Sequence, residues 1–118
     1  MEQLYEAVDA VDWNTALGLW QAARDAENQY DEAYWTPAYH VSEAGGAAIS
    51  PDLNCEIERL QDVRLDAEEK LVFTPALNLP AVMAKMELCR KRWEDFSDWP
   101  DTWWDAVMCD LRRLAGKS

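Results

Sequence analysis

The residues of this chain that could carry out covalent or metal chemistry are few and widely separated. There is one histidine, His40, and the three cysteines stand at positions 55, 89 and 109, with no C-x-x-C pair. Metal and redox sites bring such side chains together, and helical di-metal sites use Glu-x-x-His motifs, which this sequence lacks. The adjacent glycines at 45–46 are too few for a phosphate-binding loop. The sequence therefore predicts a protein that is not an enzyme and needs no cofactor or metal, with cysteines acting as small apolar residues.

Acidic residues are numerous enough to indicate what kind of partner the protein binds. The net charge is -12, and its distribution is uneven. Residues 1–58 contain 12 acidic residues and one basic residue, Arg24, for a net charge of -11, whereas residues 59–118 contain 11 acidic and 10 basic residues, for -1. Such a surface repels nucleic acid and anionic lipid and attracts basic proteins. We therefore expect a basic protein partner, and neither direct nucleic-acid binding nor membrane binding.

Many of the acidic residues recur about one helical turn apart, in three rows. The rows are Glu2, Glu6 and Asp9; Glu27 and Asp31; and Glu58, Asp62 and Asp66. Like charges at this spacing destabilise a helix by ~0.2–0.5 kcal/mol per pair, so helix stability does not explain them. If the rows converged, they would imitate a phosphate backbone, although one row offers a charge only every ~6 Å against every ~1.7 Å of duplex DNA. The alternative is a solvated face that keeps the protein in solution.

Tryptophans form the second candidate site. Trp93, Trp99, Trp103 and Trp104 lie within 12 residues of one another. Trp103 and Trp104 are neighbours on an expected helix and point ~100° apart, so they cannot both face one core. Trp104 falls in the apolar stripe of that helix, which leaves Trp103 and Trp99 as exposed binding anchors on its flank. The alternative is that both residues plug the end of a small helical bundle.

The elements that must position these residues have helical periodicity throughout. The chain of 118 residues with 49% hydrophobic content is expected to form one domain, residues 1–118, that removes roughly two-thirds of its unfolded surface from water. No apolar run approaches the ~20 residues of a membrane span. The N-terminus is acidic where a secretory signal would be basic, so we expect a cytoplasmic protein.

Prolines and capping residues divide the chain into helices. Pro75 should end a helix near Phe73. Asn78 should cap the next helix from Leu79, and Ser50 should cap the helix that begins at the following proline. We predict an all-α bundle with four main helices at 13–34, 51–73, 79–96 and 101–115, a long loop at 35–50, and a short N-terminal helix that is either separate or continuous with the first main helix.

The apolar stripes of these helices predict the core. In the first two helices a charged residue, Glu27 and Arg64 respectively, occupies one position of the stripe. In the last two helices the stripes are continuous. They consist of Val82, Met86, Cys89, Trp93 and Phe96, and of Trp104, Val107, Met108, Leu111 and Leu114.

The second half of the chain resembles a known group of proteins. The runs TPA at 74–76, AKM at 84–86 and DLRRLAG at 110–116 are similar to those of a loose group of small, uncharacterised bacterial and prophage-type helical proteins. The resemblance covers residues 66–116. It implies a helical fold and a mobile-element setting, and it transfers no functional residues.

Two hypotheses of function follow. The first is a non-enzymatic acidic binding module, a phage or mobile-element inhibitor that masks the basic nucleic-acid-binding surface of a host defence protein. The second is a structural or self-assembling helical subunit, a homo-oligomer that uses the tryptophan-rich patch and the 35–50 loop as contacts.

Overall fold

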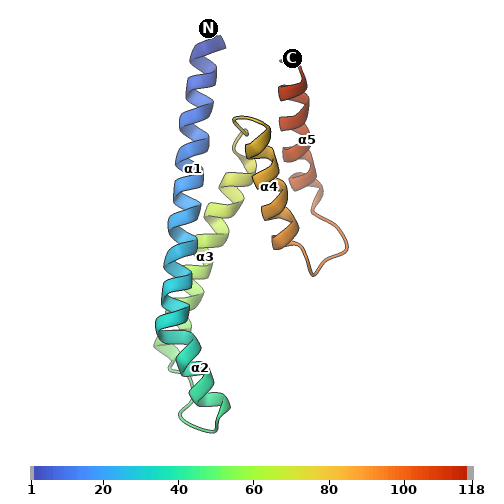
Figure 1. The fold of residues 1–118 in the computed structure, drawn as a ribbon. Coiled ribbons are helices and arrows are strands. Elements are labelled where there is room, and N and C mark those ends of the chain that lie inside the picture. The colour runs from blue at the N-terminus through green and yellow to red at the C-terminus, as the bar shows by residue number, and fades with distance from the viewer. Residues whose placement is uncertain (1, 117–118) are drawn as a thin grey trace. The chain divides into compact units, whose positions relative to one another are not determined.

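The computed structural model describes the backbone of residues 2–116 and the side chains of residues 12–116. The part of the chain that it describes is all-α, as the sequence predicts. The elements, shown in Figure 1, are α1 (Glu2–Tyr30), a π-helical segment η1 (Asp31–Trp35), α2 (Thr36–Glu43), α3 (Pro51–Phe73), α4 (Leu79–Arg92) and α5 (Asp101–Ala115). None of the described helices contains an apolar stretch long enough to cross a membrane.

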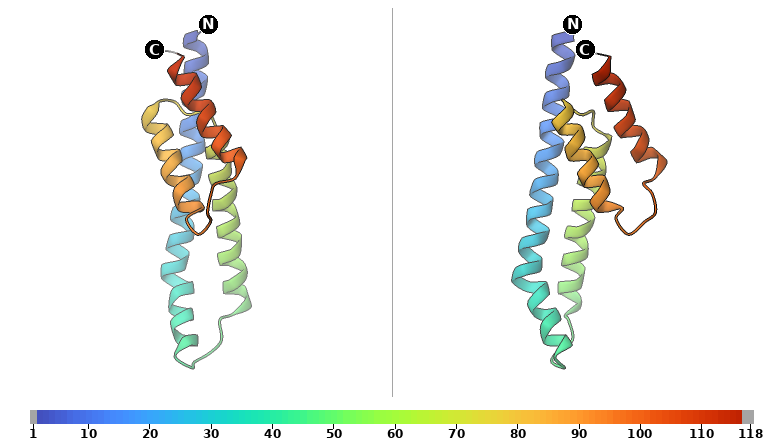
Figure 2. Two further views of the ribbon diagram at one scale, coloured as in Figure 1. Left: turned by 90° about the vertical axis from the view of Figure 1, so that its right-hand side faces the viewer. Right: turned by 45° about the vertical axis from the view of Figure 1, so that its right-hand side comes forward.

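The chain divides into two compact units, and the boundary falls within α1 and within α3. Unit 1 comprises Met1–Leu17 and Glu69–Ser118, and unit 2 comprises Gly18–Glu68. In unit 1, α4 and α5 lie side by side and run in opposite directions, as the two views of Figure 2 show. In unit 2, the second half of α1 and the first part of α3 form a helical hairpin.

The N-terminal segment is continuous with the first main helix. α1 runs from Glu2 to Tyr30 without a break. No proline occurs in this stretch, and Gly18 does not interrupt the helix because a single glycine costs only about 1 kcal/mol there. A separate short N-terminal helix is therefore wrong, and the continuous alternative is confirmed.

The predicted loop at 35–50 is wrong over its first half, because the chain stays helical past Pro37 and α2 ends only at Glu43. A proline inside a helix lacks an amide N–H, and its ring clashes with the carbonyl one turn earlier. Here η1 widens the preceding turn, and the Thr36 N–H donates to the Asp31 carbonyl five residues back. The Thr36 hydroxyl also donates to the Asp31 carboxylate at 2.7 Å. The π-helical turn thus accommodates the proline within a continuous helical rod.

The two adjacent glycines end α2. Gly45 has a φ of +87°, a left-handed conformation that glycine adopts without steric penalty. Its N–H donates to the Ser42 carbonyl at 3.1 Å, and the Gly46 N–H donates to the Val41 carbonyl at 2.9 Å. These two bonds form a Schellman motif, the common C-terminal cap of helices. The glycine pair is therefore structural punctuation.

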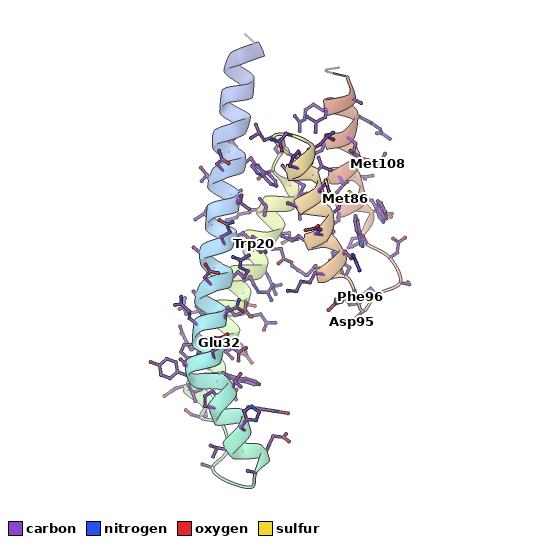
Figure 3. The ribbon with its side chains drawn as sticks, in the orientation of Figure 1. Trp20, Glu32, Met86, Asp95, Phe96 and Met108 are labelled. Carbon is purple, nitrogen blue, oxygen red and sulfur yellow. The ribbon has the colours of Figure 1, made fainter. Side chains whose placement is uncertain are left out.

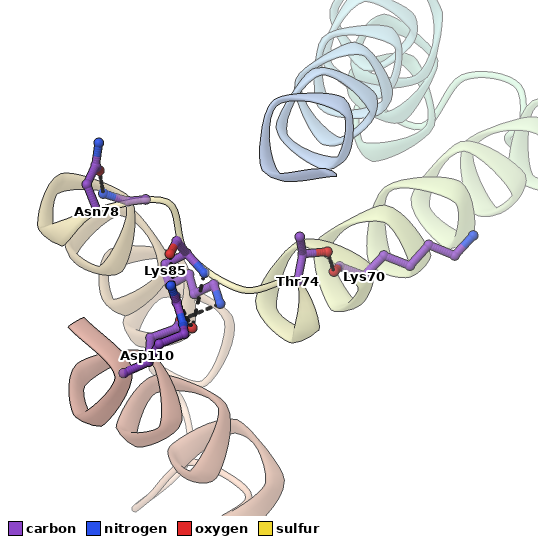
Figure 4. A network of polar contacts seen from close by, with 8 residues as sticks. Lys70, Thr74, Asn78, Lys85 and Asp110 are labelled. Carbon is purple, nitrogen blue, oxygen red and sulfur yellow. Dashed lines mark hydrogen bonds and ion pairs between the residues drawn. The ribbon is translucent and has the colours of Figure 1, made fainter. Parts of the chain in front are cut away.

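The boundaries around the α3–α4 connection are those predicted. α3 ends at Phe73, and the Thr74 hydroxyl donates to the carbonyl one turn earlier at 2.6 Å. α4 begins at Leu79, and the Asn78 side chain accepts a hydrogen bond of 3.0 Å from the Ala81 N–H, as drawn in Figure 4. The side-chain cap satisfies one of the unpaired amides at the start of the helix.

α4 ends earlier than predicted, at Arg92 and not at residue 96. Trp93 leaves the helical conformation with φ -110° and ψ 21°. Its ring then packs edge-on against Trp103 of α5, with ring centroids 5.2 Å apart. The two indoles thus pack together where α4 ends.

The predicted stripe of α4 is half correct. Val82 and Cys89 are buried, whereas Met86 is 39% and Phe96 63% exposed. Lys85 occupies an inward position of this helix and is only 1% exposed. The helix is therefore rotated about its axis relative to the predicted stripe, and the reason is the ion pair that Lys85 makes.

Candidate functional site

A buried network of charged groups lies at the centre of unit 1. The Lys85 ammonium group donates to the Asp110 carboxylate at 2.6 Å, and the two residues are 1% and 4% exposed. The same carboxylate accepts from the Ala76 N–H at 3.1 Å and from Arg113 at 3.3 Å, and the Arg113 guanidinium also donates to the Ala76 carbonyl. Figure 4 shows the network joining α4, α5 and the segment after α3.

This network is organised to hold helices together. The Lys85 ammonium lies 5.6 Å from the centre of the Trp13 ring, which adds a cation–π contact from α1. Burial lowers the pKa of Lys85 below its ordinary value, although the hydrogen bond to Asp110 opposes that shift. Because the Asp110 carboxylate bonds to Lys85 of α4, to Arg113 of α5 and to the Ala76 N–H, the network joins these parts of unit 1.

Trp103 is buried, so its prediction as an exposed binding anchor is wrong, whereas the alternative, that it packs in the bundle, agrees with the structure. Trp103 is 3% exposed and Val107 1%, and both lie on the same inward face of α5 as Asp110. Trp104, which was predicted for the core, is 38% exposed. The charged residue belongs to the core-facing stripe through its pairing with Lys85, so the helix turns Trp103 inward.

The exposed tryptophan is part of a small aromatic cluster. Trp104 stacks on Trp99 with ring centroids 4.4 Å apart and an interplanar angle of 25°. The Trp104 indole N–H and the Trp99 backbone N–H each donate to one oxygen of Asp98 at 2.8 Å. These two hydrogen bonds lower the pKa of Asp98 below its ordinary value. Trp99 is thus half-buried at the surface of unit 1. It stacks on Trp104, which was predicted to lie in the core.

In unit 2, the two charged residues that interrupt the apolar stripes face each other. Arg64 of α3 forms an ion pair with Glu27 of α1, and their side chains are 23% and 17% exposed. Arg64 also donates to Glu68 at 3.2 Å, and the Trp20 indole N–H donates to the same carboxylate at 3.2 Å. Glu27 is therefore a partner within the hairpin, and its predicted place on an exposed acidic row is wrong.

The remaining predicted acidic residues fall into three groups. Asp31 is half-buried and accepts from the Thr36 hydroxyl, so it is not part of an exposed row either. The side chains of Glu2, Glu6 and Asp9 lie outside the described residues. The third row is exposed along its whole length and comprises Glu58, Asp62 and Asp66 of α3. Of the predicted rows, only this one is presented to solvent among the described side chains.

The basic residues of unit 2 are committed to other carboxylates. Between positions 18 and 68 there are 11 acidic and three basic residues, which gives this unit a net charge of -8. Arg24 pairs with Asp25 at 3.2 Å and Arg59 pairs with Glu56 at 2.6 Å, while Arg64 serves Glu27 and Glu68. The hydrogen bond from Arg59 lowers the pKa of Glu56. Within the described residues, therefore, no arginine of this unit pairs with the α3 row.

Unit 1 also contains an open depression of about 530 Å³ beside α5. It brings together Phe73, Asp105, Cys109 and Arg112, among other residues. The buried pair Lys85 and Asp110 also lines this depression. Among the side chains that the structure places, no three or more His, Cys, Asp or Glu residues are arranged to hold a metal ion.

No protein-family model, no curated protein and no solved structure matches this chain.

Proposed function

We propose that the chain is a non-enzymatic helical binding module whose unit 2 engages a basic protein surface through the outward face of α3. The observation that carries this proposal is the row of Glu58, Asp62 and Asp66, exposed at successive turns of one helix. Like charges at this spacing weaken a helix. Their presence therefore calls for a reason outside the folding of the helix, and a positively charged partner supplies one.

The position of the row on α3 supports binding. The inward face of α3 carries Arg64, Glu68 and the apolar residues of the hairpin, so the acidic row points away from α1. With a net charge of -8 in 51 residues, unit 2 attracts cations at a distance as well as at contact.

The spacing of the charges narrows the kind of partner. One row offers a carboxylate every ~6 Å, whereas duplex DNA offers a charge every ~1.7 Å. A row this sparse matches a basic helix or loop, with its charges one turn apart, better than a groove shaped for a phosphate backbone. The wider hypothesis, that this basic surface belongs to a nucleic-acid-binding host defence protein, stays a prediction.

A direct test measures binding of a fluorescein-labelled, lysine-rich amphipathic helical peptide by fluorescence anisotropy. We expect the unaltered protein to bind this probe. The triple variant Glu58→Gln, Asp62→Asn, Asp66→Asn should bind the probe at least tenfold more weakly. Raising the salt from 50 to 200 mM should weaken binding of the unaltered protein, because the screening length falls to about 8 Å at 0.15 M.

The matched control removes the same amount of charge from other exposed positions of unit 2. The control triple variant is Glu32→Gln, Glu43→Gln, Asp52→Asn, and it should retain most of the affinity. Equal losses in the two triple variants would show that only net charge matters and would reject the α3 row as the site. Absence of binding by the unaltered protein at low salt would reject the proposal altogether.

A further inference from the structure

α4 has an apolar row on its solvent-facing side. Leu79, Met83 and Met86 are 58%, 62% and 39% exposed, and they recur at i, i+4 and i+7. This spacing is that of a helix face that packs against another element. The inward side of α4 already packs in the core through Lys85 and Cys89. α4 is therefore apolar on two faces, and the described residues cover only one of them.

α5 repeats this arrangement. Trp104 and Met108 are 38% and 39% exposed, one turn apart, while Trp103 and Val107 face the core. Figure 3 labels Met86 and Met108 on the two neighbouring helices, at the same level of the α4–α5 hairpin. The outward rows of both helices thus share one side of unit 1.

The helical positions explain why the two rows coincide. In α4, Met86 follows Lys85 by one residue, and in α5, Met108 precedes Asp110 by two. Lys85 and Asp110 point at each other across the hairpin, with 2.6 Å between their charged atoms. Because α4 and α5 run in opposite directions, a rotation of ~100° after Lys85 and of ~200° before Asp110 brings both methionines to the face that points away from the core.

We propose that this face, formed by Leu79, Met83, Met86, Trp104 and Met108, is the interface of an antiparallel homodimer. Five partly exposed large side chains present on the order of 500 Å² of apolar surface. A standard interface buries about 800 Å² on each partner, and a homodimer interface is about 65% apolar, which amounts to roughly the same apolar area. The occupant is a second copy of this chain.

The charges along α5 argue for a second copy in the antiparallel orientation. Asp101 and Asp105 stand in the first half of α5 and Arg112 in the second half, all exposed, on the side of the helix next to Met108. In an antiparallel pair of identical helices, this row of charges lies beside the same row of the partner, and the first half of one helix lies beside the second half of the other. The aspartates of one copy then lie against Arg112 of the other, and the pairing occurs twice by symmetry. In a parallel pair, the like-charged ends of the helices would lie together.

Sedimentation equilibrium of the full chain between 1 and 100 µM tests the dimer. We expect a concentration-dependent monomer–dimer equilibrium that Met108→Glu shifts at least tenfold towards monomer. The control is Val63→Glu on α3, which places the same charge at an apolar position that is 45% exposed. Circular dichroism of both variants checks that helicity is retained.

A charge exchange tests the orientation. Asp105→Arg and Arg112→Asp should each weaken the dimer at least fivefold, because like charges then face each other at both ends. The double variant carries both changes, restores opposite charges across the interface, and should dimerise like the unaltered protein.

Two outcomes would overturn the proposal, and both are independent of the binding assay for unit 2. A chain that remains monomeric at 100 µM would show that another occupant, or none, covers this face. A dimer that Met108→Glu and Val63→Glu weaken equally would place the interface elsewhere.

Discussion

Replacing Lys85 by methionine is expected to destabilise the protein by about 3 kcal/mol, because it leaves a buried carboxylate without its closest cation. Methionine has a similar length and helix propensity, so the change removes the charge with little effect on packing. Removing one member of a buried ion pair costs about 3–5 kcal/mol. Asp110 keeps the Ala76 N–H at 3.1 Å and Arg113 at 3.3 Å, which places the cost at the lower end of that range.

Urea unfolding followed by circular dichroism gives the free energy, and thermal unfolding gives a second measure. For a chain of this length, a loss of about 3 kcal/mol corresponds to a fall in Tm of about 12 °C. The matched control is Arg59→Met in the ion pair with Glu56. That pair has the same 2.6 Å separation, but its side chains are 61% and 36% exposed. Solvent screens it, so the urea midpoint of this control should not change measurably.

A double-mutant cycle isolates the interaction between the two charges. Asp110→Asn keeps an oxygen for the Ala76 N–H and removes the negative charge, so it leaves Lys85 buried without a counter-ion. We expect the Lys85→Met, Asp110→Asn double variant to be at least as stable as the less stable of the two single variants. The coupling energy between the two residues should be at least about 2 kcal/mol. A cost below about 1 kcal/mol for Lys85→Met, or additive single effects, would refute the assignment of this pair as the centre of unit 1.

Three further predictions concern helix ends and the aromatic cluster. Asn78→Ala should lower the free energy of unfolding by about 1 kcal/mol in urea titrations, because the first turn of α4 loses its side-chain cap; an unchanged midpoint would contradict the capping role. Gly45→Ala should also lower the free energy of unfolding by about 1 kcal/mol, because a φ of +87° disfavours any residue with a side chain, although no atom obstructs the space around Gly45. Gly18→Ala should instead raise the free energy of unfolding, because Gly18 lies in a helix interior with open space around it. The Asp98 carboxyl should titrate below the ordinary value of ~3.9 in an NMR titration, because the folded state favours its charged form; its contribution to stability is then present above the unfolded pKa and is lost as the pH falls through the folded pKa. In Trp104→Phe, which removes the indole donor, the pKa of Asp98 should move back towards that ordinary value.

Local chemistry was sufficient to predict most helix boundaries. Pro75 with Asn78, and Ser50 before a proline, act within a few residues of themselves, and the starts and ends that they predict around α3 and α4 agree with the structure. The loop predicted at 35–50 was wrong over its first half because the helix continues through Pro37. The effect of this proline depends on a π-helical turn and on the bond between Thr36 and Asp31, which a rule about proline alone does not contain.

The candidate sites were less accessible to such reasoning. Glu27 and Arg64 were each recognised as an interruption of an apolar stripe, and their occurrence on two helices was a usable indication that they pair. Lys85 and Asp110 carried no such indication, because the apolar stripes predicted for their helices are continuous, and the predicted core left both residues out although they are buried. As a result, the burial predicted for Trp103 and Trp104 is reversed: Trp103 is buried and Trp104 is exposed.

By itself the sequence determined that this protein is helical, where most of its helices begin and end, and that its negative charge is concentrated in the first half. These properties follow from spacing and from neighbours along the chain. Only the tertiary structure decided how each helix is rotated about its axis, and hence which carboxylates and which indole reach solvent. The physical reason is that a buried charge is tolerated only when it is paired or hydrogen-bonded, and for Lys85 and Asp110 the opposite charge comes from another helix, which only the folded chain brings close.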